Sequence, residues 1–331
     1  MTLATGVVAV PAQAASTGVV VVRGKRTVEY QAGSGRQNNV VVTRSGRTIT
    51  IDDRVAVKPG KGCRPVKNDK TKVTCTTAKT PTEIRIFTHD RNDVVVNRTD
   101  VRLVANGGTG RDRLTGGPRG DNLAGGSGDD ILVGGAGDDT LLGDSGNDRV
   151  YGGAGDDGLF GERGRDRLEG GAGFDFLEGD DPALGVAADV LLGGPDEDSV
   201  SYGSYRKPLT IDLDGSARDD GQAGEHDTVG ADIETVFGGW GSDRITGNAA
   251  DNFLRGSGGN DILLGGAGND YLDGDSDRDR LYGGSGDDEL IGDEDSRAVD
   301  RLDGGTNSPA GDACRPDSRD TKVGCERRAP R

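Results

Sequence analysis

The sequence is poor in the residues that build an ordinary globular core. Only 32% of its 331 residues are hydrophobic and 4% are aromatic, with one tryptophan and one methionine. No apolar run approaches the roughly 18 residues of a membrane-spanning helix, so we expect no such segment. Glycine is abundant instead, with 59 residues. This composition indicates disorder unless the glycines recur with a period.

Histidine is also scarce, which removes several catalytic chemistries. The two histidines are His89 and His226, and the H-E-x-x-H motif of zinc proteases is absent. The sequence has no G-x-S-x-G nucleophile elbow and no P-loop. An acidic run at 273–279 begins like an EF-hand loop, but Arg278 stands where that loop needs glycine. We therefore identify no catalytic residue and expect a protein that is not an enzyme.

The four cysteines form two close pairs, Cys63 with Cys75 and Cys314 with Cys325. This spacing favours two short-loop disulfides and an oxidising compartment. A zinc site built from all four thiolates is the alternative, although no C-x-x-C motif occurs. An apolar stretch ahead of an A-x-A pattern predicts a signal peptide over residues 1–14, and hence secretion. Because a positively charged start is missing, a frayed strand is the alternative there.

The net charge changes sign along the chain. Residues 1–106 carry 18 basic and 8 acidic residues, whereas residues 107–331 carry 22 and 49. This difference indicates two differently built regions. The acidic region argues against nucleic acid as a partner, because phosphate binding needs dense Lys and Arg, and it favours a divalent cation. The basic region favours anionic cell-envelope or matrix polymers, with an ordinary basic surface as the alternative.

Residues 15–106 are predicted to form a basic, β-rich domain. Gly60–Thr76 reads as a lysine-rich loop closed by the first cysteine pair, which a small β-domain would need for stability. The remaining β-branched runs have strand length and are separated mostly by turn residues. The strands predicted from them are Val19–Val22, Thr27–Tyr30, Asn39–Thr43, Thr48–Asp52, Glu83–Phe87, Val94–Val96 and Val101–Val104.

From Gly107 the sequence repeats every nine residues. Each unit follows G-G-x-G-x-D-x-U-x, where U is a large apolar residue, as in GGSGDDILV at 125–133. The first block keeps this phase without a slip as far as residue 178. Its sixth-place aspartates are Asp112, Asp121, Asp130, Asp139, Asp148, Asp157, Asp166 and Asp175, and its eighth-place residues are Leu114, Leu123, Leu132, Leu141, Val150, Leu159, Leu168 and Leu177.

Five extra residues within Asp180–Ala188 break the phase before it resumes, and a second block of nines starts at Gly238. The segment between the blocks departs from the pattern. In a weaker tail Cys314 takes the apolar eighth place, so its disulfide would staple the last coil. The predicted organisation is a signal peptide over 1–14, the basic β-rich domain over 15–106, a first block over 107–201, an irregular insertion over 202–237, a second block over 238–312 and a disulfide-stapled cap over 313–331.

A nine-residue period suits a short strand followed by a tight glycine turn. Two nines then make one coil of a flattened solenoid, and residues 18 apart stack ~4.8 Å from one another. Carboxylates at about 5 Å repel by about 3 kcal/mol at an effective dielectric of about 20. Cations between the coils would relieve this repulsion, and hard oxygen ligands select Ca²⁺, the one cofactor that we expect. The predicted metal ligands are Asp112, Asp121, Asp130, Asp139, Asp148, Asp157, Asp166, Asp175, Asp198, Asp243, Asp261, Asp270, Asp279 and Asp288.

A glycine–aspartate turn without metal is the alternative for any single repeat. It is favoured at Gly116–Ala124, where Arg119 replaces the fourth glycine, and at Gly247–Arg255, where Asn252 replaces the aspartate. We also expect the insertion within Asp180–Ala188 to interrupt a column of ions.

Units such as GGAGDDTLL and GGAGNDYLD resemble the repeats-in-toxin, or haemolysin-type calcium-binding, nonapeptide. The resemblance implies an all-β fold, a right-handed parallel β-roll or β-solenoid, with Ca²⁺ lodged between the turns of successive coils. It implies that sixth-place aspartates and turn carbonyls hold each ion, and that folding depends on calcium after export. A short β-rich domain ahead of the repeats looks most like the stand-alone secreted bacterial members.

Two functional hypotheses follow. The first is a non-catalytic extracellular protein whose acidic roll folds on binding Ca²⁺ and acts at a surface or in a matrix. The second is an extracellular, polysaccharide-active enzyme that uses clustered carboxylates in residues 202–237, with the roll as a stability module.

Overall fold

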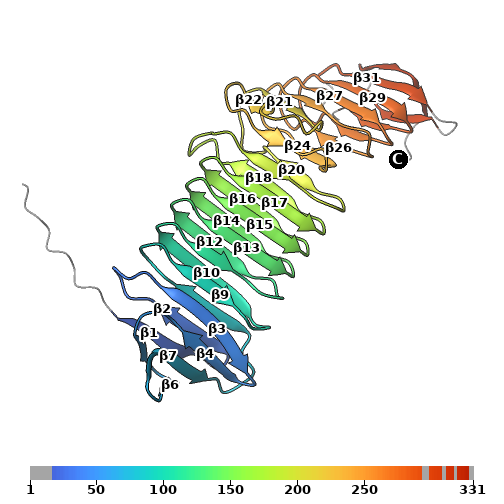
Figure 1. Ribbon diagram of the computed structural model, residues 1–331. Coiled ribbons are helices and arrows are strands. Elements are labelled where there is room, and N and C mark those ends of the chain that lie inside the picture. The colour runs from blue at the N-terminus through green and yellow to red at the C-terminus, as the bar shows by residue number, and fades with distance from the viewer. Residues whose placement is uncertain (1–16, 293–297, 308–310, 317–318, 328–331) are drawn as a thin grey trace, which may run out of the picture.

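The computed structural model describes residues 17–292, 298–307, 311–316 and 319–327, so the predicted signal peptide lies outside the described residues. Within them the chain is a long parallel β-roll with strands on two faces and turns along two edges (Figure 1). The all-β solenoid predicted from the sequence is thereby confirmed. No helix of the described residues is long and apolar enough to cross a membrane.

One face of the roll is a single sheet of 16 strands that runs through the described chain. It consists of β1 (Gly18–Arg23), β2 (Thr27–Gln31), β5 (Val57–Pro59), β8 (Glu83–Phe87), β10 (Arg102–Thr109), β12 (Asn122–Ser127), β14 (Thr140–Ser145), β16 (Gly158–Arg163), β18 (Phe176–Asp180), β20 (Ser199–Ser201), β24 (Thr235–Phe237), β26 (Phe253–Arg255), β28 (Tyr271–Asp273), β30 (Glu289–Ile291), β32 (Asp312–Arg315) and β34 (Cys325–Arg327).

The opposite face is divided into two sheets, of 11 and 7 strands. The first consists of β3 (Asn39–Ser45), β4 (Thr48–Asp52), β6 (Cys63–Val66), β7 (Asp69–Thr76), β9 (Val94–Asn97), β11 (Arg113–Thr115), β13 (Ile131–Ala136), β15 (Arg149–Ala154), β17 (Arg167–Ala172), β19 (Val190–Leu192) and β23 (Thr228–Val229). The second consists of β21 (Leu209–Asp212), β22 (Gly221–Gln222), β25 (Arg244–Thr246), β27 (Ile262–Ala267), β29 (Arg280–Gly286), β31 (Arg301–Asn307) and β33 (Thr321–Val323).

The core of the roll is a row of side chains from the eighth place of each repeat. Leu132 of β13 lies in register with Val150 of β15, 18 residues later, and both are fully buried. The eighth-place residues of the first block all have exposed fractions between 0% and 2%. Because one inward side chain per strand fills the space between the faces, a chain with few hydrophobic residues still builds a continuous core.

The N-terminal segment shares its sheets with the repeats. β8 pairs in parallel with β10, and β9 with β11, so hydrogen bonds cross the change of sequence pattern at residue 107. Antiparallel pairs, among them β1 with β2 and β3 with β4, close this end of the roll. The predicted strands Thr48–Asp52 and Glu83–Phe87 are confirmed with the same bounds.

The prediction of a loop at Gly60–Thr76 is wrong. This segment forms the antiparallel hairpin β6–β7, in which Cys63 pairs directly with Cys75 and forms the predicted disulfide. Asn68 makes its turn in the left-handed region, with φ of 62°. The alternation of buried Val73 and Cys75 with more exposed neighbours is the strand signal, which the many lysines obscure.

The segment 202–237 forms a one-sided seam in the roll. On the continuous face β20 pairs with β24 across it. On the other face β19 pairs with β23, which ends one sheet, whereas β21 pairs with β25 in the next. Within this segment β21 comes first in the chain, and β23 and β24 follow it. The coil therefore continues along one face only.

The last described coils end in the second predicted disulfide. Cys314 lies in register with Leu290 at the apolar inward place and is 2% exposed. It is bonded to Cys325 in β34, the next strand of the same sheet. This bond ties the terminal coil to its neighbour, as the sequence predicts.

Candidate metal centre

Each sixth-place aspartate uses one carboxylate oxygen in a ladder along the edge of the roll. The backbone N–H of Asp112 donates to Oδ1 of Asp130 over 2.6 Å, and that of Asp130 donates to Oδ1 of Asp148 over 2.7 Å. Bonds of this kind connect four columns of side chains. The first column is Asp93, Asp112, Asp130, Asp148, Asp166, Asp189 and Asp227, and the second is Asp121, Asp139, Asp157, Asp175, Asp198 and Glu234. The third column is Asp243, Asp261, Asp279, Asp300 and Asp320, and the fourth is Asn252, Asp270, Asp288 and Asp312.

All fourteen aspartates named from the sequence lie in these columns, but the columns contain further members. The additional residues are Asp93, Asp189, Asp227, Glu234, Asn252, Asp300, Asp312 and Asp320. Several of these precede a short strand as D-x-U, as in Asp189-Val190-Leu191 and Asp227-Thr228-Val229. The three-residue pattern D-x-U could have identified these residues as column members, because they do not keep the strict spacing of nine.

The hydrogen-bonded ladder of carboxylates continues past the insertion within Asp180–Ala188, while the expected interruption of an ion column there stays a prediction. The N–H of Asp166 donates to Oδ1 of Asp189 over 2.8 Å, although 23 residues separate them. β17 and β19 also keep the usual register. The five additional residues leave the edge as a loop, and the ladder continues beneath it.

The second carboxylate oxygen of many column aspartates is buried without a hydrogen-bond partner. The residues concerned are between 1% and 2% exposed, and a buried polar atom without a partner costs about 1–3 kcal/mol. They comprise Asp112, Asp130, Asp139, Asp148, Asp157, Asp166, Asp175, Asp189, Asp198, Asp261, Asp270 and Asp288. This repeated shortfall indicates that a ligand from outside the chain completes the turns.

Burial also opposes ionisation of these carboxylates. Loss of solvation is the main cause that raises the pKa of Asp148 to about 8. The hydrogen bond from the N–H of Asp130 lowers this pKa, and the smaller repulsion from neighbouring carboxylates raises it. Loss of solvation likewise raises the pKa of Asp139 to about 8 and that of Asp130 to about 7. A cation beside the column would reverse this effect, because it stabilises the charged form.

The first glycine of a repeat leaves space where oxygen atoms converge. A Cβ placed on Gly125 would lie 2.4 Å from Oδ2 of Asp130 and 2.9 Å from the carbonyl oxygen of Gly143 in the next coil. A carboxylate and a backbone carbonyl from successive coils therefore face the same small volume. Both are hard oxygen donors of the kind that Ca²⁺ prefers, so the residues present fit calcium.

In a few turns, backbone donors of the chain bond both carboxylate oxygens of the sixth-place aspartate, or the amide oxygen of the sixth-place asparagine. Oδ2 of Asp121 accepts the N–H of Gly117 over 2.6 Å, and Oδ2 of Asp243 accepts that of Gly239 over 2.8 Å. The amide oxygen of Asn252 accepts the N–H of Asn248 over 2.8 Å. Two of these three turns are those for which the sequence favours a turn without metal.

Two buried acids of the seam, Asp227 and Glu225, accept hydrogen bonds from protein donors on both oxygens. Oδ2 of Asp227 accepts the hydroxyl of Tyr202 over 3.0 Å, while its Oδ1 accepts the N–H of Asp189. Glu225 accepts the hydroxyl of Tyr205 and the N–H of Gln222. These two carboxylates serve the local structure, whereas Asp212, Asp214 and Asp219 of the same segment bring one carboxylate oxygen each within 4.8 Å of one another.

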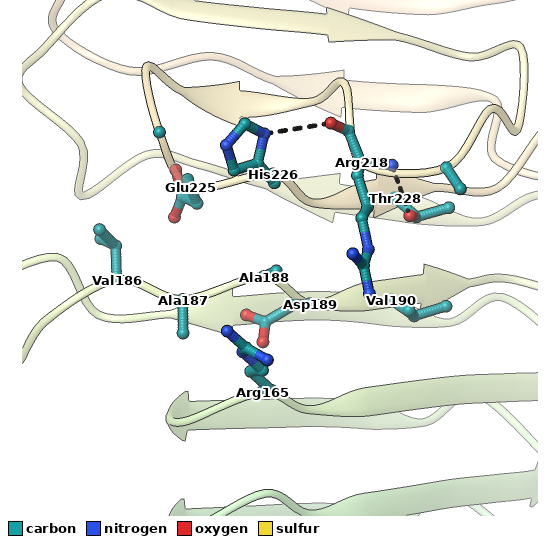
Figure 2. Close-up of a pocket in the computed structure, with 12 residues that line it drawn as sticks. Arg165, Val186, Ala187, Ala188, Asp189, Val190, Arg218, Glu225, His226 and Thr228 are labelled. Carbon is teal, nitrogen blue, oxygen red and sulfur yellow. Dashed lines mark hydrogen bonds between the residues drawn. The ribbon is translucent and has the colours of Figure 1, made fainter.

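Beside these acids lies a pocket of about 440 Å³ on the turn edge (Figure 2). It is lined by Glu225 and His226 on one side and by Arg165 and Asp189 on the other. Nδ1 of His226 lies 3.3 Å from the backbone carbonyl oxygen of Arg218, so this imidazole is engaged with a main-chain group rather than with an acid.

Comparison with known protein families agrees with this geometry. The model described as the RTX calcium-binding nonapeptide repeat (4 copies) matches residues 106–141, 133–168, 160–181, 237–272 and 265–297. These matches fall in both blocks of nines, where they end at residues 181 and 297, and they omit the seam. A search of curated proteins found no significant match. The matched repeats of both blocks are therefore RTX calcium-binding nonapeptide repeats, and they form a parallel β-roll.

Proposed function

We propose that this chain is a non-catalytic extracellular protein whose roll folds as Ca²⁺ binds between successive coils. The observation that carries the proposal is the row of buried aspartate oxygens without hydrogen-bond partners. A folded chain that retained those oxygens uncompensated would be unstable, because each costs about 1–3 kcal/mol. Binding that occurs only in the folded state supplies the missing free energy.

In this proposal the ligands come from neighbouring coils. Oδ2 of a column aspartate and the carbonyl oxygen of the first-place glycine in the next coil would contact each ion, as Asp130 and Gly143 exemplify. The ion supplies positive charge that neutralises the column, while the chain supplies the spacing. A single nine offers only part of the ligand set, so the binding unit is a pair of nines that are 18 residues apart.

The site of action proposed is outside the cell, at a surface or in a matrix. Two disulfides are typical of proteins from oxidising compartments. Extracellular calcium modules bind at about 10⁻⁴–10⁻³ M, the range in which a protein exported into calcium would fold. The basic N-terminal segment, with 18 basic against 8 acidic residues over 1–106, is the proposed contact for anionic envelope polymers.

The proposal is tested on the full chain by circular dichroism and equilibrium dialysis. After removal of metal with a chelator, about 1–10 mM Ca²⁺ is expected to increase the β signal, with several ions bound per chain. The same concentration of Mg²⁺ is expected to have little effect, since Mg²⁺ keeps its water and needs a stricter geometry. A chain that binds no Ca²⁺ at 10 mM, or that responds equally to both ions, contradicts the proposal.

A further inference from the structure

The loop that leaves the first column within Asp180–Ala188 brings in a carboxylate that the regular repeat lacks. Asp180 occupies the second place of its nine, directly after Gly179, where most repeats have glycine. Its side chain is 2% exposed at the end of β18. Its Oδ2 accepts the N–H of Ala187 over 2.5 Å, which ties the loop back to its own start.

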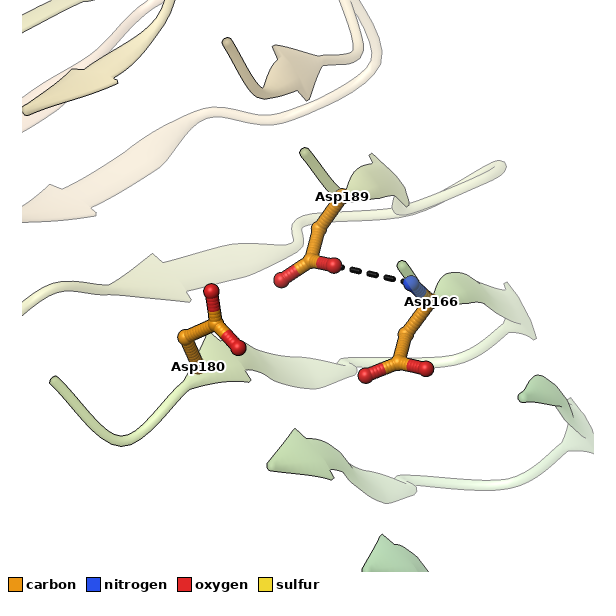
Figure 3. A group of neighbouring side chains, drawn as sticks. All are labelled: Asp166, Asp180 and Asp189. Atoms are coloured by element: carbon orange, nitrogen blue, oxygen red, sulfur yellow. Dashed lines mark hydrogen bonds between the residues drawn. The ribbon is translucent and has the colours of Figure 1, made fainter. Parts of the chain in front are cut away.

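Asp180 faces two members of the first column. One carboxylate oxygen from each of Asp166, Asp180 and Asp189 belongs to a group whose atoms all lie within 4.8 Å of one another. Figure 3 shows the three carboxylates directed toward a shared space between two coils. Each residue keeps one buried oxygen without a hydrogen-bond partner: Oδ2 of Asp166, Oδ1 of Asp180 and Oδ2 of Asp189.

The preceding coils show that an acid at this place does not by itself form such a group. Asp144 and Glu162 stand in register with Asp180 on β14 and β16. Both adopt the left-handed backbone region, with φ of 74° and 75°, and both are half-buried. Asp180 lies outside that region, and its side chain is buried with the column. The loop therefore changes the backbone at this place and redirects the carboxylate.

We propose that Asp166, Asp180 and Asp189 form a distinct Ca²⁺ site that binds more tightly than the regular sites between coils. The proposal rests on the calcium function proposed above and adds one chain-specific site to it. Three carboxylates in place of two raise the negative charge around the ion, and affinity for calcium rises with ligand charge. We expect this site to bind at least about tenfold more tightly than the regular sites.

The test compares the full-length wild type with two charge-matched variants, Asp180→Asn and Glu162→Gln. Each is dialysed against buffered free Ca²⁺ over about 10⁻⁶–10⁻² M, and bound calcium is measured by mass spectrometry. The wild type is expected to hold about one ion per chain where the regular sites are empty. Asp180→Asn is expected to lose that ion and keep the later binding, whereas Glu162→Gln keeps both.

The outcomes separate this proposal from the broader one. No calcium bound by the wild type at any concentration contradicts the proposed function itself. Regular binding without an early ion, or an early ion that Asp180→Asn retains, overturns the tight site alone. If Asp180→Asn fails to reach the wild-type β signal in saturating Ca²⁺, Asp180→Gly, which restores the usual residue of the repeat, replaces it with the same expected loss. Retention of the early ion by that variant also overturns the site.

Discussion

The roll contains two kinds of turn that differ in how the sixth-place side chain is satisfied. In the open turns, such as those of Asp139 and Asp148, one buried carboxylate oxygen has no partner in the chain. In the closed turns, a backbone N–H or a tyrosine hydroxyl donates a hydrogen bond to that oxygen, as at Asp121, Asp227 and Asp243. Similar residues on one scaffold thus give either an ion site or a self-contained turn.

The closed turns lie at the ends of columns. Asp121 begins the second column, Asp243 and Asn252 begin the third and fourth, and Asp227 ends the first. Each of these residues has a neighbouring member of its column on one side only, although Asp93, which begins the first column, keeps its Oδ2 buried without a partner. The chain supplies a donor of its own to each of the closed turns. The capacity to bind an ion depends on the neighbouring coil as much as on the aspartate.

Removal of calcium is expected to have the largest effect, because it should destabilise the open turns of the repeats but not the N-terminal strands. In chelator, amide hydrogens in the open turns of the first block should exchange rapidly, because several sites lose about 2.7 kcal/mol each if calcium had exceeded Kd by about 100-fold. Strands β1 to β4, whose core includes Val20, Val28 and Ile49, should remain protected. Hydrogen exchange with mass spectrometry measures this. Uniform loss of protection in both regions would contradict it.

Acidification is expected to replace calcium in part. Burial raises the pKa of Asp148 to about 8 and that of Asp130 to about 7 in the calcium-free fold, against an ordinary value of 3.8. The protonated form therefore favours folding. The contribution of these protonated carboxyls to the free energy of unfolding is fully present below about pH 4 and is lost as pH rises through about 7 to 8.

Thermal melts measure this pH dependence. In chelator the Tm should fall between pH 5 and pH 8, whereas in saturating Ca²⁺ it should rise over the same interval, because ions and protons compete for the same oxygens. Parallel curves under the two conditions would refute the role of the open carboxylates.

Single substitutions should distinguish an open from a closed turn. Asp148→Asn removes a ligand oxygen and should reduce the stabilisation by calcium by about 2.7 kcal/mol at 100 times Kd. Asp121→Asn disturbs the bond from Gly117 and should destabilise the chain by about 1–3 kcal/mol, equally with calcium and with chelator. Denaturant unfolding under both conditions gives the two differences. An equal loss of calcium stabilisation in both variants would remove the distinction.

An effect of the same size as that of Asp121→Asn is expected at the closed end of the first column. Tyr202→Phe deletes the hydroxyl that donates to Asp227 and leaves a buried carboxylate oxygen without its partner. We expect a loss of about 1–3 kcal/mol in chelator. Recovery of that loss in Ca²⁺ would show that the variant turn now accepts an ion, whereas an equal loss under both conditions would show that the turn stays closed.

The period of nine was sufficient to predict the roll, its inward residues and most of its columns. Asp112 to Asp175 recur without a slip, so their alternation between two edges follows from 18 residues per coil. The distinction between open and closed turns was predictable only where a repeat residue changes. Arg119 and Asn252 mark such changes, whereas the turn of Asp243 keeps its glycines and is closed by a backbone donor.

The remaining features depend on contacts that are distant in sequence. Asp227 enters the first column 38 residues after Asp189, and its second partner is a tyrosine 25 residues before it. No local pattern specifies either distance. The joining of the N-terminal strands to the roll was equally hidden, because His89 and Arg91, with φ of 73° and 82°, stand in the turn where the repeats have glycine, while the parallel pairing continues.

The one-sided seam has a consequence for cooperativity. In a solenoid each coil gains stability only from the coils next to it, so order spreads by nearest-neighbour coupling. At residues 202–237 that coupling passes through one face, by the pairing of β20 with β24, while the other face is divided between β23 and β21. The seam is therefore a weak link, and the blocks on either side should melt as two units with separate calcium dependences.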